Sequence, residues 1–141
     1  STVDLSETLK NMLEEFRELF ELKNIHREAD IQESVTLEAD KVLIELLLTN
    51  LINNAIRHNW EKGKIKMTLT DSSLLISNTG PELTIDPKEL FNRFKKSNQS
   101  SQSLGLGLAI VKKICDFYDY EIKYEFTDDL HTIQLAFLPP K

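Results

Sequence analysis

The sequence predicts a two-layer α/β sandwich, in which about three helices cover one face of a mixed, mostly antiparallel sheet of about five strands. Two observations support this fold class. Long segments with apolar residues at helical spacing alternate along the chain with short segments that are typical of strands. Several of the short segments follow one another across short polar turns, which favours antiparallel pairing. Because helices and strands are mixed in this way, we expect the helices to pack on one face of the sheet.

Length and composition are those of one folded domain. The chain has 141 residues, of which 40% are hydrophobic and 28% are charged, and such a chain can bury one sizeable core. Its formal net charge of −6 argues against non-specific binding to nucleic acid. The single cysteine, Cys115, excludes an internal disulfide and a cysteine-rich zinc site. We expect it to be a small apolar residue on a packed helix.

Membrane and targeting segments are not recognisable in the sequence. No apolar run approaches the roughly 18 residues of a membrane-spanning helix, and no signal peptide is visible. The chain begins Ser-Thr-Val-Asp, without Met. We therefore expect a fragment of a longer protein, without direct membrane contact of its own.

The first part of the chain predicts two helices with two short strands between them. Residues 5–23 place apolar side chains at helical spacing, and residues 25–37 are expected to form the two strands. Asp40 then precedes a second helix over about residues 41–58. The apolar positions of the first helix are Leu5, Leu9, Met12, Leu13, Phe16, Leu19, Phe20 and Leu22.

The middle of the chain predicts a strand pair followed by a short helix. Residues 64–70 alternate apolar and polar, and residues 74–78 form a second strand after a polar turn. Asp86 is a candidate N-cap and Pro87 suits the first helical position. Residues 95–103 are polar, without an apolar anchor, and we expect them to be mobile.

The last part of the chain predicts a glycine-opened helix and a hairpin. The segment "LGLGLAIVKKICDFY" starts with glycines at residue 104 and continues as an apolar helix. The segments "EIKYEFT" and "HTIQLAFL" follow as two strands.

Three asparagines interrupt the apolar pattern of the second helix. On a helical wheel, one face is apolar and consists of Ile44, Leu48, Leu51, Ile52 and Ala55. An arc of roughly 140° on the other side holds Asn50, Asn53, Asn54, Arg57 and His58. Amides offer donors and acceptors without net charge, and Mg²⁺ takes few protein oxygens together with substrate phosphates. This face suits a metal–phosphate ligand, and the alternative is a solvated helix face that contains asparagine by accident.

The glycines favour the ligand interpretation. Gly80 lies in "SNTGP", directly after a strand, and Gly105 and Gly107 open the last helix. Glycine permits close backbone approach, and a helix N-terminus offers free N–H groups and a positive dipole end to phosphate. Gly63 is interpreted as a turn residue. Between these motifs, the segment from Thr79 to Leu104 has the length of a lid or of a disordered loop.

With these motifs in this order, the sequence resembles the ATP-binding catalytic domain of bacterial sensor histidine kinases. That domain belongs to the superfamily shared with DNA gyrase, the heat-shock chaperone ATPase and the mismatch-repair ATPases. The resemblance covers nearly the whole chain and implies one domain over residues 1–141, with an ATP lid over about residues 79–104. The matching motifs are "NLINNAIRH" for the asparagine box, "SNTGP" and "LGLGLAIVKKI" for the two glycine boxes, "LFNRF" for the phenylalanine box and "HTIQLAFLP" for the last strand.

The resemblance implies a nucleotide-binding role for the matching residues. Asn54 would be the Mg²⁺ ligand, and Asn50, one turn earlier, would line the same site. Asn78 would read the adenine base, and Gly80 belongs to the same glycine box. The backbone N–H groups that contact phosphate would come from Gly105, Leu106 and Gly107.

Basic residues and the lid complete the implied site. Phosphate charge would be neutralised by Arg57, His58 and Arg93, with help from Lys95 or Lys96. In the family, two phenylalanines anchor the lid, and the matching residues here are Phe91 and Phe94.

Two positions depart from the family pattern. Asn78 stands where the family usually has an Asp that accepts a hydrogen bond from the adenine amino group. The Asn oxygen can also accept, but the bond lacks charge assistance. Ser103 stands where the family has the first glycine of its G-x-G-x-G motif, while Gly105 and Gly107 preserve the entry into the helix.

The implied activity is that of a protein-histidine kinase fragment. The domain would bind Mg²⁺-ATP and donate the γ-phosphoryl group to a histidine on a separate dimerisation domain. None of His26, His58 and His131 fits the family's acceptor, so the acceptor domain is absent from these residues and autophosphorylation by them alone is not expected. The implied partners are ATP or ADP, that domain and, through the full-length protein, a response regulator. We expect a monomeric cytoplasmic domain of a membrane-bound sensor.

Two other functions stay open at this point. The departures at Asn78 and Ser103 leave room for a degenerate nucleotide-binding or docking module without kinase activity. An anti-sigma-type serine kinase has the same fold, although "LFNRF" argues against it. Measurable magnesium-dependent affinity for ATP would distinguish the kinase domain from the degenerate or docking module. Phosphorylation of a protein serine in trans would instead identify an anti-sigma-type kinase.

Overall fold

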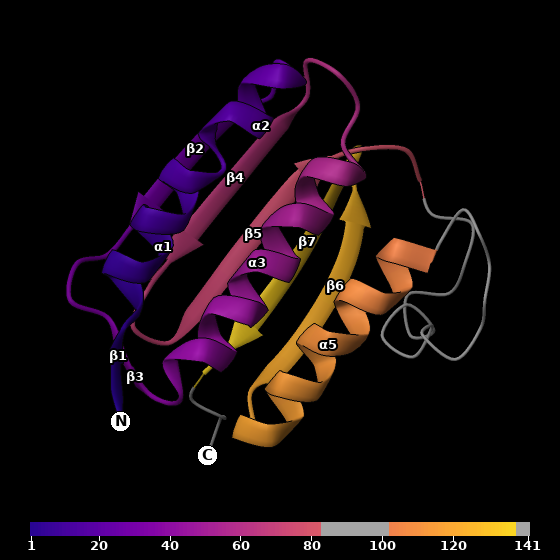
Figure 1. The fold of residues 1–141 in the computed structure, drawn as a ribbon. Coiled ribbons are helices and arrows are strands. Elements are labelled where there is room, and N and C mark those ends of the chain that lie inside the picture. The colour runs from indigo at the N-terminus through magenta and orange to yellow at the C-terminus, as the bar shows by residue number, and fades with distance from the viewer. Residues whose placement is uncertain (83–101, 138–141) are drawn as a thin grey trace.

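The computed structural model describes residues 1–82 and 102–137, with the backbone only for residues 102–106 (Figure 1). The elements in chain order are β1 (Thr2–Asp4), α1 (Leu5–Glu15), α2 (Arg17–Leu22), β2 (His26–Ile31), β3 (Thr36–Glu38), α3 (Lys41–Arg57), β4 (Lys64–Leu69), β5 (Ser73–Thr79), α5 (Gln102–Tyr118), β6 (Glu121–Thr127) and β7 (Leu130–Ala136).

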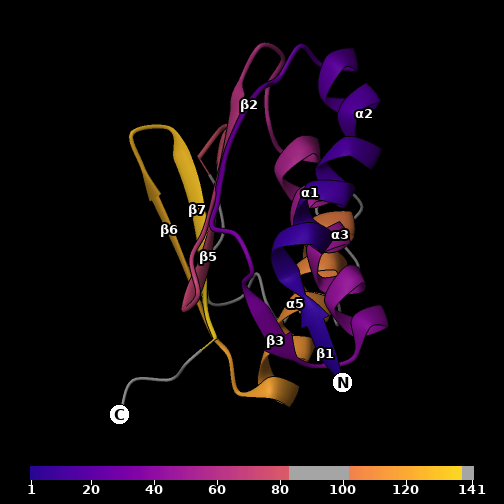
Figure 2. The same cartoon turned by 90° about the vertical axis from the view of Figure 1, so that its left-hand side faces the viewer.

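The described elements form two layers, as the sequence predicts. Five strands make one sheet in the order β2-β4-β5-β7-β6, in which β2 pairs parallel with β4 and the other neighbours are antiparallel. Helices α1, α2, α3 and α5 all cover one face of this sheet, and no helix of the described residues lies on its other face (Figure 2). The α/β sandwich with a mixed, mostly antiparallel sheet is confirmed.

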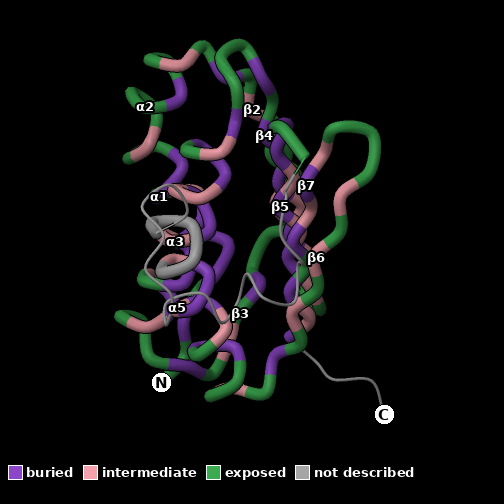
Figure 3. The backbone as a smooth tube through the Cα atoms, turned by 90° about the vertical axis from the view of Figure 1, so that its right-hand side faces the viewer, coloured by how far each residue is buried: buried purple, intermediate pink, exposed green. Residues whose placement is uncertain are grey.

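The core lies between the helices and the inner face of the sheet, where buried backbone positions of both layers face each other (Figure 3). The expected apolar face of α3 is the centre of this core, since Ile44, Leu48, Leu51, Ile52 and Ala55 are all buried. Alternate residues of the central strands point to the same side, as strand geometry requires. Cys115 is also buried on α5, as the sequence predicts, and burial raises the pKa of its thiol to about 12, which makes the thiol unreactive.

The expected single helix over residues 5–23 is wrong, because the structure has two helices that meet at Phe16. Its φ of −88° and ψ of 1° end α1, and its carbonyl accepts hydrogen bonds from Leu19 and Phe20 as α2 begins. The bend keeps Phe20 in the core but turns Leu19 and Leu22 outward, where 43% and 76% of their surfaces are exposed. Helical spacing alone could not predict this change of direction.

The two expected strands within residues 25–37 exist, but they lie in different sheets. β2 joins the main sheet, whereas β3 pairs with β1 in a separate two-stranded sheet. The β1 strand is too short to give an alternation signal and was not predicted. A buried hydroxyl links the two regions, because Ser6 Oγ donates to the carbonyl of Gln32 at 2.5 Å and accepts from the amide of Val35 at 2.9 Å.

The starts of α3 and α5 differ in how well they were predicted. Asp40 is the N-cap of α3, since its Oδ1 accepts from the amides of Val42 and Leu43 at 2.8 and 3.2 Å. Helix α5 begins at Gln102, two residues before the expected start at Leu104. The two additional residues, Gln102 and Ser103, are polar, so hydrophobic periodicity could not assign them to the helix.

The last hairpin is closed by a two-residue turn. Asp128 and Asp129 have φ values of 54° and 65°, which two-residue hairpin loops of type I′ require and which Asp tolerates. The expectations for residues 83–101, including the N-cap Asp86, the short helix and the mobile loop, lie outside the described residues. None of the described helices is long and apolar enough to cross a membrane.

Candidate functional site

The polar face of α3 lines a small pocket together with the start of α5. The pocket has a volume of about 70 Å³ and is lined by Asn50, Asn53, Asn54, Arg57, His58 and Gly107. All five residues of the predicted polar arc therefore lie together, and a glycine of the second glycine box is opposite them. The volume fits a group the size of a phosphate with a metal ion rather than a whole nucleotide.

Two buried polar atoms in this pocket have no hydrogen-bond partner among the described residues. They are Asn54 Oδ1 and His58 Nε2, which lie one turn apart on α3. Buried polar atoms are nearly always hydrogen-bonded, and an unsatisfied one costs about 1–3 kcal/mol. Both atoms therefore suit a bound polar group, and the oxygen is of the type that Mg²⁺ prefers.

Asn50 faces α5 with its side-chain oxygen. Its Nδ2 donates to the carbonyl of Leu46 at 2.8 Å, so the amide is oriented and its Oδ1 remains as an acceptor. A Cβ added to Gly107 would lie 3.3 Å from this oxygen. A side chain at position 107 would thus narrow the pocket from the α5 side, which explains why a glycine suits this position.

His58 ends α3, and its surroundings favour the neutral imidazole. Burial lowers the pKa of His58, and the positive charges of Arg57 and Lys23 lower it further. In the free domain His58 is therefore a hydrogen-bonding group rather than a cation. Arg57, in the exposed last turn of α3, supplies the positive charge at this end of the pocket.

Lys23 is a residue of the site's surroundings that the sequence did not reveal. Its Nζ donates to the carbonyls of Ile56 and Asn59 at 2.9 and 3.2 Å, and to that of Arg57 at 3.4 Å. A cation at a helix C-terminus stabilises carbonyls that lack partners within the helix. Lys23 therefore fixes the end of α3 from α2, and only the fold brings these two chain segments together.

The end of β5 packs directly against the end of α3. A Cβ on Gly80 would lie 2.3 Å from the carbonyl oxygen of His58, so only glycine allows this approach. Asn78 is buried two residues earlier, and its Nδ2 donates to the carbonyl of Thr79 at 2.9 Å. Because a carbonyl only accepts, this bond leaves Asn78 Oδ1 as the acceptor. Neither Asn78 nor Gly80 lines the small pocket, but Gly80 borders the same helix end.

A buried polar network joins the same two chain segments. Thr79 Oγ1 donates to Asn59 Oδ1 at 2.5 Å and accepts from the amide of Lys64 at 2.9 Å, and Asn59 Nδ2 donates to the carbonyl of Lys64 at 2.9 Å. A Cβ on Gly63 would lie 1.9 Å from Asn59 Oδ1. Gly63 is thus more than a turn residue, and no sequence signal short of an alignment could have shown it.

The first turns of α5 carry the second glycine box. The described helix begins at Gln102, and the carbonyl of the residue before a helix already accepts the first intrahelical bond, from the fourth helical residue. The N–H groups that lack partners within the helix therefore end at Leu104. The N–H groups of Gly105, Leu106 and Gly107 lie beyond that limit, inside the helical ladder. Their expected contact with phosphate would require the helix to begin later than it does here.

The remaining predicted site residues lie outside the described part of the chain. They are Phe91, Arg93, Phe94, Lys95 and Lys96. Ser103 lies on the described backbone, inside α5.

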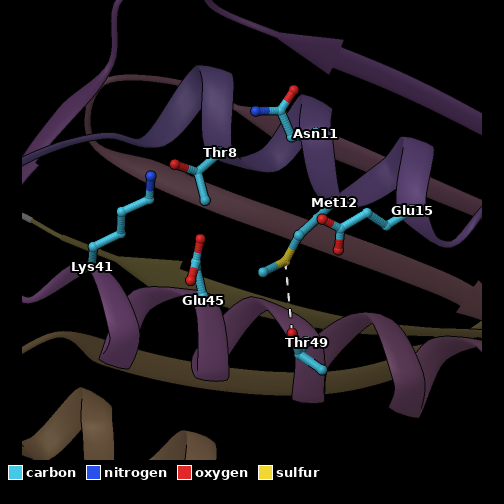
Figure 4. A pocket seen from close by; sticks show the side chains of 7 residues that line it. All are labelled: Thr8, Asn11, Met12, Glu15, Lys41, Glu45 and Thr49. Carbon is cyan, nitrogen blue, oxygen red and sulfur yellow. Dashed lines mark hydrogen bonds between the residues drawn. The ribbon is translucent and has the colours of Figure 1, made fainter.

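A second and larger pocket lies between α1 and α3, with a volume of about 280 Å³. Figure 4 shows side chains from both helices around it, with the Thr49 hydroxyl 3.8 Å from the sulfur of Met12. Its lining consists of Thr8, Asn11, Met12, Glu15, Lys41, Glu45 and Thr49. None of its described side-chain atoms is both buried and unpartnered. The smaller pocket is therefore the better candidate for a polar ligand.

Comparison with known proteins identifies the family. Residues 39–140 match the family described as "Histidine kinase-, DNA gyrase B-, and HSP90-like ATPase". The chain belongs to this ATPase family. The match includes every residue of the candidate pocket, as well as the end of β5.

Among the relatives of this ATPase domain are sensor histidine kinases. Sensor histidine kinase HprS of Escherichia coli (strain K12) is 32% identical over 146 residues, which cover 99% of this chain and 32% of HprS. The catalytic domain of histidine kinase ThkA superposes with a TM-score of 0.77 at 28% identity, covering 96% of this chain and 93% of that one. A structure of ThkA in complex with response regulator protein TrrA gives a TM-score of 0.73 at 26% identity, covering 98% and 42%.

These likenesses confirm the resemblance seen in the sequence. The chain is the ATP-binding catalytic domain of a sensor histidine kinase. It spans about a third of the length of HprS.

Proposed function

We propose that this domain binds Mg²⁺-ATP and donates the γ-phosphoryl group to a histidine on a separate dimerisation domain of its parent kinase. Residues 1–141 act as one catalytic domain in this proposal, and ADP remains bound after transfer until it exchanges. The acceptor histidine lies outside these residues, so the domain alone does not autophosphorylate. Since ATP is an intracellular substrate, we place the domain in the cytoplasm, as part of a membrane-bound sensor.

One observation carries the proposal, namely the unpartnered oxygen of Asn54 inside a pocket of amides. Asn54 Oδ1 is buried without a hydrogen-bond partner among the described residues. An oxygen that is desolvated in this way gains from any cation that replaces the lost water. The family match and the position of Asn54 in the asparagine box support the same role.

The donor set fits a magnesium ion. Asn54 would hold it, and Asn50 Oδ1 is a further neutral oxygen on the same face, opposite Gly107. Mg²⁺ usually takes only one or two protein oxygens and completes its shell with phosphate and water. When bound, it neutralises negative charge on the phosphates during phosphoryl transfer.

The protein groups of the pocket hold and orient the phosphates. Phosphoryl transfer is mostly a matter of positioning and charge neutralisation. Arg57 supplies a permanent positive charge beside the pocket, and the neutral His58 offers a hydrogen bond through its unpartnered Nε2. Arg93 and one of Lys95 and Lys96 add positive charge in the proposal, on the strength of the resemblance.

The base lies beyond the pocket, toward the end of β5. The pocket of about 70 Å³ cannot hold a whole nucleotide, since ligand pockets usually measure roughly 300–1,000 Å³. Asn78 offers its Oδ1 there as an acceptor, because its Nδ2 already donates to the carbonyl of Thr79. An acceptor is what the 6-amino group of adenine requires.

The histidine and the response regulator are inferred from the family. ThkA has been solved with a response regulator protein bound, and a partner of this type receives the phosphoryl group in our proposal. The net charge of −6 makes nucleic acid an unsuitable partner.

Calorimetric titration with ADP and with a non-hydrolysable ATP analogue tests the proposal directly. We expect binding by the wild-type domain that strengthens with Mg²⁺, and loss of that magnesium dependence in Asn54→Ala. Asn11→Ala is the matched control, because it removes an exposed Asn amide from the other pocket and should bind nucleotide like the wild type.

Two outcomes would overturn the proposal. If the folded wild-type domain binds neither nucleotide, the chain is a docking module rather than an ATP site. If Asn54→Ala retains the full magnesium dependence, Asn54 is not the metal ligand. Transfer of ³²P from ATP to an added dimerisation domain of the parent kinase, measured with both variants, then tests the phosphoryl step.

A further inference from the structure

His131 occupies the strand position next to Asn78. In the register of the sheet, Asn78 of β5 pairs with His131 of β7, and His131 pairs in turn with Phe126 of β6. Residues paired across antiparallel strands project from the same face of the sheet, which here is the helix-covered face. His131 is itself buried, and the sequence motifs give it no functional role.

Both ring nitrogens of His131 are used. Nε2 lies 2.8 Å from the carbonyl oxygen of Pro81, and Nδ1 is hydrogen-bonded to the hydroxyl of Tyr124. Because a carbonyl only accepts, Nε2 must carry a proton, and Nδ1 of the neutral ring then accepts from the Tyr124 hydroxyl. Burial lowers the pKa of His131 more than its backbone hydrogen bonds raise it, which agrees with the neutral form.

The ring also packs against the backbone of the glycine box. A Cβ on Gly80 would lie 3.3 Å from His131 Cδ2 and 3.4 Å from Nε2. On its other sides the ring is held by two aromatic rings, with centroids 5.8 Å away for Tyr124 and 4.5 Å away for Phe126. The imidazole therefore has little freedom to turn.

His131 supplies the described hydrogen bond that holds residue 81 to the last hairpin. Proline has no N–H to donate, and the amide of Gly80 makes a longer bond, of 3.3 Å, to the carbonyl of Asp129. The bond from His131 to Pro81 is shorter and comes from a buried side chain. It acts at the point where β5 ends, three residues after Asn78.

We propose that His131 is a positioning residue, which holds residues 80–81 through its Nε2–H and thereby sets the orientation in which Asn78 presents its oxygen to the nucleobase. The proposal rests on the proposed nucleotide function and deepens it. His131 does not touch the phosphates in this role. It acts through the backbone on the side chain that reads the base.

Replacement of His131 in the whole domain tests this role with two variants. His131→Phe keeps an aromatic ring but cannot donate to Pro81, whereas His131→Gln can donate through its amide. We expect His131→Phe to weaken ATP binding about tenfold, as loss of one positioning hydrogen bond allows, and His131→Gln to restore most of it. His26→Gln, on the exposed strand β2, is the histidine control and should bind like the wild type.

Base selectivity separates positioning from a general loss of structure. ITP carries a 6-oxo group in place of the 6-amino group of ATP. If His131 orients Asn78, His131→Phe should lose ATP affinity and keep most of its ITP affinity, so that the ATP/ITP ratio falls about fivefold or more. If both nucleotides weaken by the same factor in a folded variant, the positioning role is overturned.

NMR of the nucleotide-free domain gives the second readout. We expect the ¹⁵N pattern of His131 to be that of the Nε2–H tautomer. The side-chain amide signals of Asn78 should shift in His131→Phe and return toward wild-type positions in His131→Gln. Unmoved Asn78 signals would overturn the proposal even if ATP binds. If the wild-type domain binds no nucleotide at all, the proposed ATP-binding function is wrong, and the proposed role of His131 in base recognition is wrong with it.

Discussion

The hydroxyl of Thr79 lies 2.5 Å from Oδ1 of Asn59, and this buried contact joins the end of β5 to the segment that follows α3. The hydroxyl also accepts from the amide of Lys64 at 2.9 Å. Three chain segments thus meet at one oxygen atom. Since α3 carries the asparagine box and β5 carries the first glycine box, this contact sets the relative position of the two halves of the site.

We expect Thr79→Val to destabilise the domain by about 2–4 kcal/mol. The variant keeps the shape of the side chain but leaves Asn59 Oδ1 and the amide of Lys64 without a partner, and each such group costs about 1–3 kcal/mol when buried. Urea unfolding followed by circular dichroism measures the change.

Thr79→Ser is the matched control for that substitution. It retains the hydroxyl and removes one methyl group, so a loss of only about 1 kcal/mol is expected. If Thr79→Val and Thr79→Ser are equally stable, the hydroxyl network contributes nothing and packing alone holds the two segments together.

Gly107→Ala should separate nucleotide binding from stability. Alanine is a better helix former than glycine by about 1 kcal/mol, and position 107 is inside α5, so the unfolding free energy should stay the same or rise. The new Cβ would lie 3.3 Å from Asn50 Oδ1 and narrow the pocket. We therefore expect ATP affinity to fall about fivefold, a loss of about 1 kcal/mol. Calorimetry and urea unfolding on the same sample test both parts, and a loss of stability without a loss of affinity would contradict the interpretation.

Gly107 and Gly63 differ in how far the sequence could predict their roles. Gly107 belongs to a recognisable motif, whereas the close approach of Gly63 to Asn59 is visible only in the structure. Hydrophobic periodicity predicted α3 and strands such as β4 and β7, because each has a regular apolar pattern over its own residues. The amide face of α3 was predicted for the same reason. By contrast, the roles of Gly63, Lys23 and His131 depend on contacts with residues distant in the sequence. A pattern within one segment carries no information on such contacts, and neither β1 nor the bend at Phe16 has a pattern of its own.

Lys23→Met should raise the pKa of His58. The ammonium group of Lys23 donates to three carbonyls at the end of α3, and its charge lowers the pKa of the adjacent imidazole. Methionine keeps the apolar stem and removes the charge, so the imidazolium form becomes easier to reach. NMR titration of the His58 ring measures the shift.

The same variant should lose about 1 kcal/mol of stability, because the partly exposed carbonyls regain water in place of the lysine. Lys62→Met, a neighbouring lysine whose side chain is exposed and does not cap the helix, is the control. A pKa of His58 that stays at its wild-type value in Lys23→Met would show that burial and Arg57 alone determine it.

We expect the domain to lose stability as the pH falls below about 6.5. Burial is the largest cause that lowers the pKa of both His58 and His131 below the ordinary value of 6.5. The unfolded chain therefore binds protons at a higher pH than the folded domain does, and the unfolding free energy rises with pH in that range. The stabilisation is fully present above pH 6.5 and is lost progressively as the pH falls through the two lowered pKa values. Urea unfolding at a series of pH values measures this slope. In the double variant His58→Gln, His131→Gln the slope between pH 6.5 and about pH 5 should become shallower, and an unchanged slope would assign the acid sensitivity to other groups.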